Sequence, residues 1–452
     1  MNGLTSGREK SERTLTLVLM IVVVGLLNAD QNLINSTLGA IEQEFRVTDA
    51  DIGLMSGLFT ILGAVVSLLI GYLSDKWNRK MLFVYSVLLS EIPCFLTAFS
   101  ANYAQFFIFR ILTGFGVGAS FPVIFSFIGD LYGEKERAGA VAWMTTVMGL
   151  GQIVGQLVSG YVGPATGWRM PFIIVSVPTL IVLLVFFLVV KEPRRGAAEE
   201  GVNSLVAQGY LYPKSIRFRD YLRLFKVRTN LFLFIQGILG TVPWGAIPLF
   251  IVKFLNENKG LSIEAATTAF LLFGAGNVAG TILGGLAGGP LLKKKPALLP
   301  QFCAVTTFLG AGVILFMFIG LPQGSLLWTL VLGFLGTFFA SMTGPNMRTM
   351  LLDTNVPENR GAIFSIFNLT DSVGTGIGKY VAGLLSASFG LAVAMWTSAG
   401  FWIPCGIFLL VAALVFAGDI KELQRRMVEV AREMKAGAGK QEARASRSPK
   451  KA

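Results

Sequence analysis

An acid and four amides interrupt the first apolar run of this sequence. Residues 18–27, VLMIVVVGLL, carry no polar side chain, and directly after them come Asn28, Asp30, Gln31, Asn32 and Asn35. On a helix of about 3.6 residues per turn, the four amides share one face and Asp30 points to the other side. We expect the amide face to line an aqueous cavity and to bond substrate. Asp30 then faces a neighbouring helix, or it reaches the cavity only after rotation.

A second polar stripe lies in the apolar segment 361–389. Its members fall within about 100° of one another on a helical wheel; they are Asn368, Asp371, Ser372, Thr375 and Lys379. Ionisable residues in membrane spans are costly and are candidates for function by default. We expect Asp371 and Lys379 to couple substrate or protons. Lys379 alternatively supports Asp371, or lies at the outer interface with its ammonium in water.

Arg110, in the apolar segment 104–131, is the cation that could pair with Asp30. At about 1.5 Å of rise per residue, the two side chains reach a similar depth in the membrane. The pair would serve proton or substrate coupling, or it would be a purely structural ion pair. Further candidates for the cavity wall are four amides and one indole: Gln152, Gln156, Gln236, Asn346 and Trp244.

The composition is that of a membrane protein with many spans. The 452 residues are 53% hydrophobic and 14% charged, whereas an average soluble domain carries about 25% charged residues. Histidine is absent, so proton chemistry would run on carboxylates or lysines. The three cysteines, Cys94, Cys303 and Cys405, lie in apolar runs and are interpreted as small buried hydrophobes. We expect no cofactor, no metal site and no enzymatic activity, because motifs for a nucleophile, a metal or a nucleotide phosphate are missing.

Twelve segments are long and apolar enough to cross a bilayer, which takes about 20 residues. They are 15–38, 51–75, 80–100, 104–131, 138–163, 170–190, 230–255, 263–291, 297–320, 325–352, 361–389 and 391–417. The sequence therefore predicts an all-α integral membrane protein with twelve transmembrane helices in two six-helix repeats. The expected divisions are an N-terminus (1–13), a first bundle (14–190), a linker (191–229), a second bundle (230–417) and a basic tail (418–452).

Loop charges orient these segments. Lys and Arg gather in the linker and in the loops after every second segment, and such loops face the cytoplasm. We expect both termini to be cytoplasmic, in a cell (inner or plasma) membrane. The basic tail is either a helix on the membrane surface or a solvated tail. Expected partners are membrane lipids, a small-molecule or lipid substrate and protons, with no nucleic acid, and the protein is expected to be a monomer.

The two halves repeat each other. Asp130 and Arg137 stand seven residues apart, as do Asp353 and Arg360, and the offset of 223 persists through the following segment. By this offset, Asp371 corresponds to Met148 and Lys379 to Gln156. At these two positions, the second repeat carries charged residues and the first repeat does not. Two such repeats predict a binding site at their interface, near the middle of the membrane.

The stretch GYLSDKWNRK (71–80) resembles the signature of the major facilitator superfamily between helices 2 and 3. The matching residues are Gly71, Leu73, Asp75, Arg79 and Lys80. The resemblance implies alternating access between two six-helix bundles. It implies a gate in which Asp75 meets the start of the eleventh helix, with Asp130, Arg137, Asp353 and Arg360 in the same motifs. Helix 3 is usually peripheral in that fold, so Glu91 ranks below the other charged candidates.

Within that superfamily, NADQN (28–32) and the following two helices are similar to the Spinster-like group. The sequence departs from that group in two places: Gln31 stands where the group usually has Arg, and Val117 and Gly118 stand where it tends to carry an acid. The group is associated with lysolipids and sphingoid lipids.

Together these features predict a secondary-active transporter that works by alternating access. The resemblance and the charges imply proton coupling and an anionic or amphipathic organic solute, such as a lysolipid. Two alternatives remain open: a small organic-anion or drug transporter of the same fold, and a membrane ligand sensor that does not transport.

Overall fold

The computed structural model describes residues 2–74, 77–132, 134–192, 224–355 and 360–445, and these are almost entirely helical. The first half contains α1 (Asn2–Asp30), α2 (Leu38–Phe45), α3 (Asp49–Ser74), α4 (Arg79–Thr97), α5 (Tyr103–Leu131), α6 (Glu134–Leu157), the π-helical η1 (Val158–Val162), α7 (Gly163–Thr166) and α8 (Met170–Val189). The second half contains α11 (Arg228–Glu257), α12 (Ile263–Lys294), α13 (Leu298–Gly320), α14 (Leu326–Ser341), α15 (Thr343–Thr354), α16 (Arg360–Phe389), α17 (Leu391–Gly400) and α18 (Trp402–Ala445).

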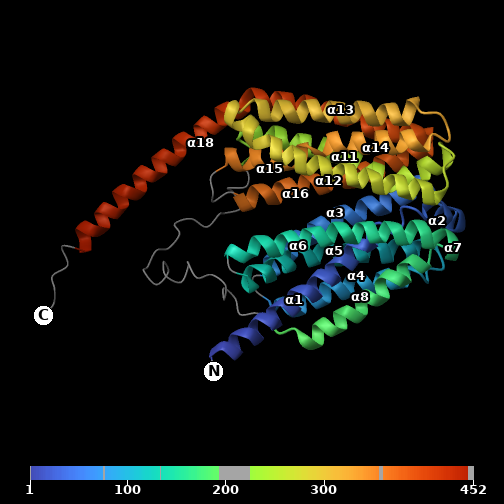
Figure 1. The fold of residues 1–452 in the computed structure, drawn as a ribbon, viewed down its shortest axis with the longest axis horizontal. Helices are drawn as coiled ribbons and strands as arrows, with labels where there is room; N and C mark the ends of the chain where they lie inside the picture. Colours follow the sequence, from blue (N-terminus) through green and yellow to red (C-terminus); the bar gives the residue numbers. More distant parts are fainter. Residues whose placement is uncertain (1, 75–76, 133, 193–223, 356–359, 446–452) are drawn as a thin grey trace.

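The two halves form two bundles that lie side by side. Figure 1 shows the blue-to-green helices on one side and the yellow-to-red helices on the other, with both termini at one end of the molecule. The short helices α2 and α7 mark the opposite end, which we call the α2 end. Helices α3 and α16 pack against each other where the bundles meet. This arrangement is that of the predicted all-α fold with two helical repeats.

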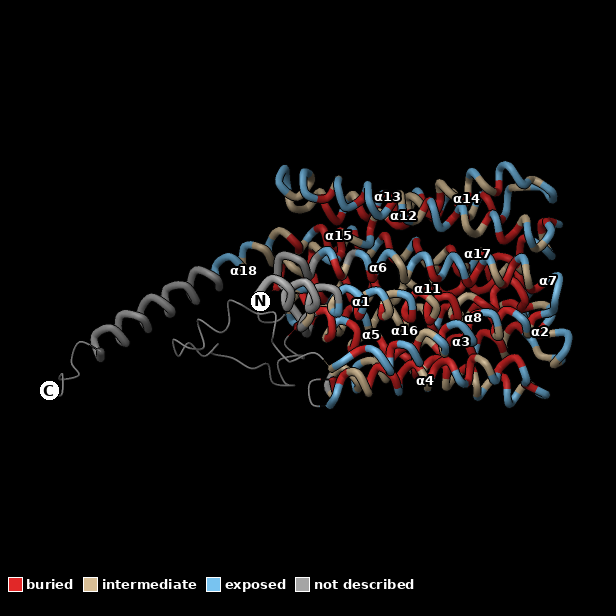
Figure 2. The backbone as a smooth tube through the Cα atoms, turned by 60° about the horizontal axis from the view of Figure 1, so that its bottom comes forward, coloured by how far each residue is buried: buried red, intermediate tan, exposed pale blue. Residues whose placement is uncertain are grey.

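Among the described residues, eleven helical stretches are apolar and long enough to cross a membrane. The twelfth long helix, α16, carries Asp371 and Lys379 and falls outside that set. Large apolar side chains remain exposed on the outside, among them Leu414 (83% exposed) and Leu188 (71%), while red, buried segments run through the interior (Figure 2). Such an apolar outer surface is what contact with lipid requires.

Three of the predicted spans differ from the observed helices. The segment 15–38 was expected to be continuous, but α1 ends at Asp30 and residues 31–37 form turns. Segment 325–352 is divided at Met342 into α14 and α15, and segment 391–417 is divided at Phe401. Helix α18 also continues far beyond the expected end at 417, to Ala445. Residues 193–223, which hold most of the predicted linker, lie outside the described residues.

The break after Asp30 has a local cause. In the turns, backbone N–H groups reach back three residues rather than four, as from Leu33 N to Asp30 O (3.3 Å) and from Asn35 N to Asn32 O (3.3 Å). Asn and Asp side chains compete with the backbone for hydrogen bonds and so disfavour a continuous helix.

Candidate functional site

Asp30 and Arg110 form an ion pair inside the first bundle. Arg110 Nη1 donates to Asp30 Oδ1 at 2.6 Å, and the two side chains are 2% and 0% exposed. The guanidinium also lies over the rings of Phe59 and Phe172, 5.0 and 5.5 Å from their centroids. Of the two orientations considered for Asp30, the structure therefore shows the one that faces a neighbouring helix.

Glu91 joins this pair, although its helix was expected to be peripheral. It is 0% exposed, and Asp30 and Arg110 both act on it electrostatically, with the Thr179 hydroxyl beside it. The buried cluster therefore contains two carboxyl groups and one guanidinium. Buried charges need a partner, so this count leaves one carboxyl without a cation of its own.

The amides after Asp30 bond one another and α6. Gln31 donates to Asn28 (3.0 Å), and Asn35 donates to Asn32 (3.3 Å). Asn32 donates to the backbone oxygen of Gln152 at 3.1 Å. Gln156 accepts from Asn35 (3.4 Å) and donates to Ser36 (2.6 Å). The predicted amide stripe is thus a hydrogen-bonded turn held against α6, rather than the face of a continuous helix.

A cavity of about 260 Å³ lies within the second bundle. Side chains from α11, α12, α13, α14, α15, α16 and α18 line it, including Gln236, Trp244, Asn277, Thr281, Thr307, Ser341, Arg348, Asp371, Trp402 and Cys405. Three of the predicted residues, Gln236, Trp244 and Asp371, therefore lie together. Besides Arg348, the wall contains hydroxyl and amide side chains that can bond a ligand.

Two charges of opposite sign lie in this cavity wall. Asp371 comes from α16, and Arg348 from α15 is the cation that acts on it. Asp371 Oδ1 and Gln236 Oε1 are buried and have no hydrogen-bond partner among the described residues. Unsatisfied buried oxygens need an explanation, and a bound ligand, proton or water would supply the missing donors.

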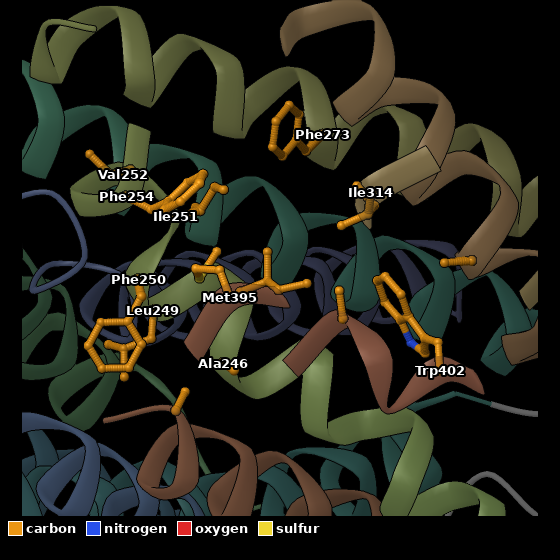
Figure 3. Close-up of a cluster of buried hydrophobic side chains, with 14 of the residues drawn as sticks. Ala246, Leu249, Phe250, Ile251, Val252, Phe254, Phe273, Ile314, Met395 and Trp402 are labelled. Atoms are coloured by element: carbon orange, nitrogen blue, oxygen red, sulfur yellow. The ribbon is translucent and has the colours of Figure 1, made fainter. Parts of the chain in front are cut away.

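Two tryptophans, Trp244 and Trp402, also line the cavity. Trp244 and Trp402 meet edge to face, with centroids 5.6 Å apart, and the Trp402 indole donates to Gly240 O at 3.1 Å. Trp402 belongs to a cluster of buried apolar side chains that also includes Phe273, Ile314 and Met395 (Figure 3). The cavity thus offers charged groups and an aromatic surface to the same ligand.

The other candidates on α15 and α16 do not line this cavity. Asn346 is 1% exposed and donates to the backbone oxygens of Gly284 and Met342, both at 2.9 Å. Asn368 is exposed, and Thr375 lies against Gly245 of α11. Lys379 donates to Thr60 of α3 at 2.9 Å, across the two halves. Lys379 therefore links the two bundles and does not line the cavity.

Residues of the predicted gate lie at the end that holds the termini. Gly71 is in α3, and Asp353 is in α15. The backbone N–H groups of Arg79 and Lys80, which begin α4, donate to the carboxylate of Glu192 at 3.0 and 2.7 Å. Asp75 lies outside the described residues, as do the side chains of Asp130, Arg137 and Arg360. The gate itself therefore stays a prediction.

Sequence reasoning missed one residue of these clusters, Arg348, and ranked another, Glu91, below the other charged candidates. Arg348 lies inside the predicted span 325–352, so the rule that singles out ionisable residues in spans would have found it. Glu91 met the same rule but ranked low because of its helix. Only packing shows that it shares a cluster with Asp30 and Arg110.

Comparisons with known proteins agree with the fold. The family model of the Major Facilitator Superfamily matches residues 20–322 and 300–429. The Sphingosine-1-phosphate transporter SPNS2 of Danio rerio is 22% identical over 426 residues, covering 87% of this chain and 82% of its own. The Hexuronate transporter of Bacillus subtilis is 21% identical over 388 residues, covering 83% of this chain and 88% of its own.

Among solved structures, a bacterial homologue of the human lysosomal transporter Spinster, in an inward-facing and unoccupied conformation, superposes with a TM-score of 0.79. It is 20% identical in sequence, and the match covers 90% of this chain and 98% of that one. The Spinster-like resemblance of the sequence is thereby confirmed. Because the family model spans most of the chain, this protein belongs to the major facilitator superfamily, a family of membrane transporters rather than enzymes.

Proposed function

We propose that this protein is a secondary-active transporter that works by alternating access, couples transport to protons, and moves an anionic or amphipathic organic solute such as a lysolipid. The observation that carries the proposal is the cavity of the second bundle, where Arg348 and Asp371 share a wall with Trp244 and Trp402. Arg348 would bind an anionic head group, and the indoles would contact an apolar part of the same ligand. At about 260 Å³, the cavity is below the size usual for drug-sized ligands, which favours a head group or a small anion.

Proton coupling is proposed for the buried carboxyl groups. Asp371 has a buried oxygen without a partner, and the first bundle holds Asp30 and Glu91 beside one guanidinium. A carboxyl group in either place can bind a proton when no cation balances its charge. Both clusters lie within membrane-spanning helices, where a coupling proton has to be carried.

Alternating access is supported by bonds that join the two halves toward the α2 end. Lys379 donates to Thr60 (2.9 Å), Ser36 bonds Thr267 (3.2 Å), and Tyr161 bonds Thr268 (2.8 Å). If Lys and Arg in the loops mark the cytoplasmic side, the α2 end is the outer one. The halves would then be closed on the outside, in the membrane of the cell and with both termini in the cytoplasm. Nothing in this mechanism needs a second copy, so we propose a monomer.

A small organic-anion transporter of the same fold is the second candidate, and the size of the cavity favours it. A thermal-shift screen of the purified protein distinguishes the two, because a ligand that binds the native state raises its melting temperature. Lysophospholipids, sphingoid lipids and small organic anions would be compared at pH 5.5 and 7.5. Stabilisation by lipids supports the lipid substrate. A response to small anions alone supports the second candidate.

Flux into vesicles then separates a transporter from a ligand sensor. Any stabilising ligand would be supplied, radiolabelled, outside proteoliposomes with an imposed pH gradient. We expect uptake that collapses when an ionophore removes the gradient. Binding without uptake in either direction would contradict the proposed transport.

A further inference from the structure

Three charged residues and one hydroxyl join the halves at the α2 end. Lys253, near the end of α11, donates to Asp49 Oδ1 at 2.7 Å and also to Glu42 Oε2. Glu42 lies on α2, and Asp49 begins α3. Ser386 of α16 donates to the other oxygen of Asp49 at 2.6 Å. The two acids therefore come from the first half, and the two donors come from the second.

The charges in this cluster do not balance. Two carboxyl groups face one ammonium, and their side chains are only 10–12% exposed. Glu257, also on α11, adds a further negative charge near Lys253 and Asp49. Glu42 Oε1 is buried and has no hydrogen-bond partner among the described residues. A proton shared between Glu42 and Asp49 would give that oxygen a partner and would lower the excess negative charge by one.

We propose that Glu42 and Asp49 form a proton-binding site that is complete only when the halves meet at the α2 end, so that closing this end takes up a proton. The inference rests on the proposed alternating access and names a proton site for it outside the membrane-spanning carboxyl clusters. Lys253 is the residue that holds both acids in place. The site belongs to neither half alone, since its acids and its cation lie on opposite sides of the interface.

The direction of the effect follows from the burial of Glu42. Burial first, and then the neighbouring Asp49, raise the pKa of Glu42 to about 8, although Lys253 opposes the change. Separation of the halves returns the carboxyl to water and moves its pKa toward the ordinary value of 4.5, although Asp49 stays beside it on the same half. A proton thus binds more tightly to the closed arrangement. Its stabilising effect is complete at acidic pH and is lost as the pH rises through about 8.

The same helix offers a matched control. Glu44 accepts from Arg169 at 2.6 Å and from Trp168 at 2.6 Å, and all three residues belong to the first half. The hydrogen bonds from Arg169 hold the pKa of Glu44 below its ordinary value. Removing the charge of Glu44 therefore alters α2 without touching the contact between the halves.

The test measures the opening of the α2 end directly. Nitroxide labels would be placed at Gln43→Cys on α2 and Ser388→Cys on α16, which are both exposed, while the native cysteines are buried. Pulsed electron paramagnetic resonance on the full chain in lipid nanodiscs gives the distance distribution at pH 5.5 and pH 9. We expect a short distance at pH 5.5 and a growing long-distance population at pH 9, with the ratio changing up to about tenfold per pH unit.

Variants assign the change to the proposed site. Glu42→Gln is expected to stay closed at both pH values, Lys253→Gln to open at both, and Glu44→Gln to behave as the parent protein. The proton site would be overturned if the ratio of the two populations did not change with pH, or if it changed equally in Glu42→Gln and in the parent protein. Either result would leave alternating access uncontradicted. A single distance in the parent and in every variant would contradict alternating access itself.

Discussion

At the scale of single residues, the protein keeps its buried charges in small mixed clusters. Arg110 holds Asp30 at 2.6 Å with Glu91 beside them, and Arg348 acts on Asp371 across a cavity. A buried charge that loses its partner is costly, whereas the loss of both partners costs much less. The two clusters differ in surroundings, since the first is enclosed by packed side chains and the second faces open volume.

Removal of one member of the enclosed pair should destabilise the first bundle strongly. We expect Arg110→Gln to cost about 3–5 kcal/mol, because it leaves Asp30 buried without a cation. The double variant Asp30→Asn with Arg110→Gln should recover part of that loss. Thermal unfolding in detergent, arranged as a double-mutant cycle, measures the coupling. Additive losses in the double variant would show that the pair contributes no interaction energy.

Arg348 should decide the affinity for an anion. Arg348→Gln is expected to weaken binding of an anionic ligand by at least tenfold, since a charge-assisted hydrogen bond contributes about 1.5–3 kcal/mol. The dissociation constant would be measured on the purified protein with a ligand found in the thermal-shift screen. Arg425→Gln serves as control, because Arg425 is 69% exposed and pairs with Glu422 on the same helix, α18. Equal affinity in Arg348→Gln and Arg425→Gln would remove Arg348 from the site.

At the scale of elements, small residues let the two bundles approach closely. A Cβ atom added at Gly57 of α3 would lie 2.6 Å from Gly376 O of α16, and one at Gly53 would lie 2.5 Å from Lys379 O. Glycines in such positions bring helix backbones together in a membrane. The interface between α3 and α16 is thus set by backbone contact, and it lies beside the bond from Lys379 to Thr60.

Gly57→Ala should therefore push α3 and α16 apart. We expect the closed population at the α2 end to fall at pH 5.5, as seen with the labels at positions 43 and 388. Gly274→Ala on α12 is the control, because a Cβ atom there meets nothing within 4 Å. It should leave the distances unchanged and can stabilise its helix by up to about 1 kcal/mol. Identical distance distributions for both variants would argue against a tight contact.

At the scale of the whole molecule, the two halves repeat in fold and differ in chemistry. Asp371 and Lys379 correspond to Met148 and Gln156 in the first half. The cavity with its two charges lies in the second half, and the enclosed ion pair lies in the first. We therefore expect the second half to bind the ligand, while both halves move as bodies about their shared interface.

Asp371→Asn should abolish proton coupling while the carrier can still change conformation. An amide cannot take up or release the proton, so gradient-driven uptake into proteoliposomes should be lost. Exchange of labelled for unlabelled substrate needs only the movement of the loaded carrier, and it should remain in part. The two assays are run on the same vesicles. Full gradient-driven uptake by Asp371→Asn would exclude this carboxyl group as the coupling site.

Much of the architecture could be predicted from the sequence because lipid imposes a simple rule. A span must be about 20 apolar residues long, so the two six-helix halves were found by counting. The depth of Asp30 and Arg110 made their ion pair possible to foresee, and the helical spacing singled out Asp371. The breaks at 31–37, Met342 and Phe401 were missed, because apolar content says little about where a helix bends.

Composition and helical period by themselves determined that this chain crosses the membrane many times and that a few charges lie inside it. Beyond the pair of Asp30 and Arg110, only the tertiary structure decided which charges meet. Glu91 reached the Asp30 cluster, and Arg348 reached Asp371, through the packing of separate helices. Lys253 meets Glu42 and Asp49 across more than 200 residues of sequence. The period of a helix specifies a face, but the neighbour of that face is set by how helices pack within each bundle and how the two bundles dock.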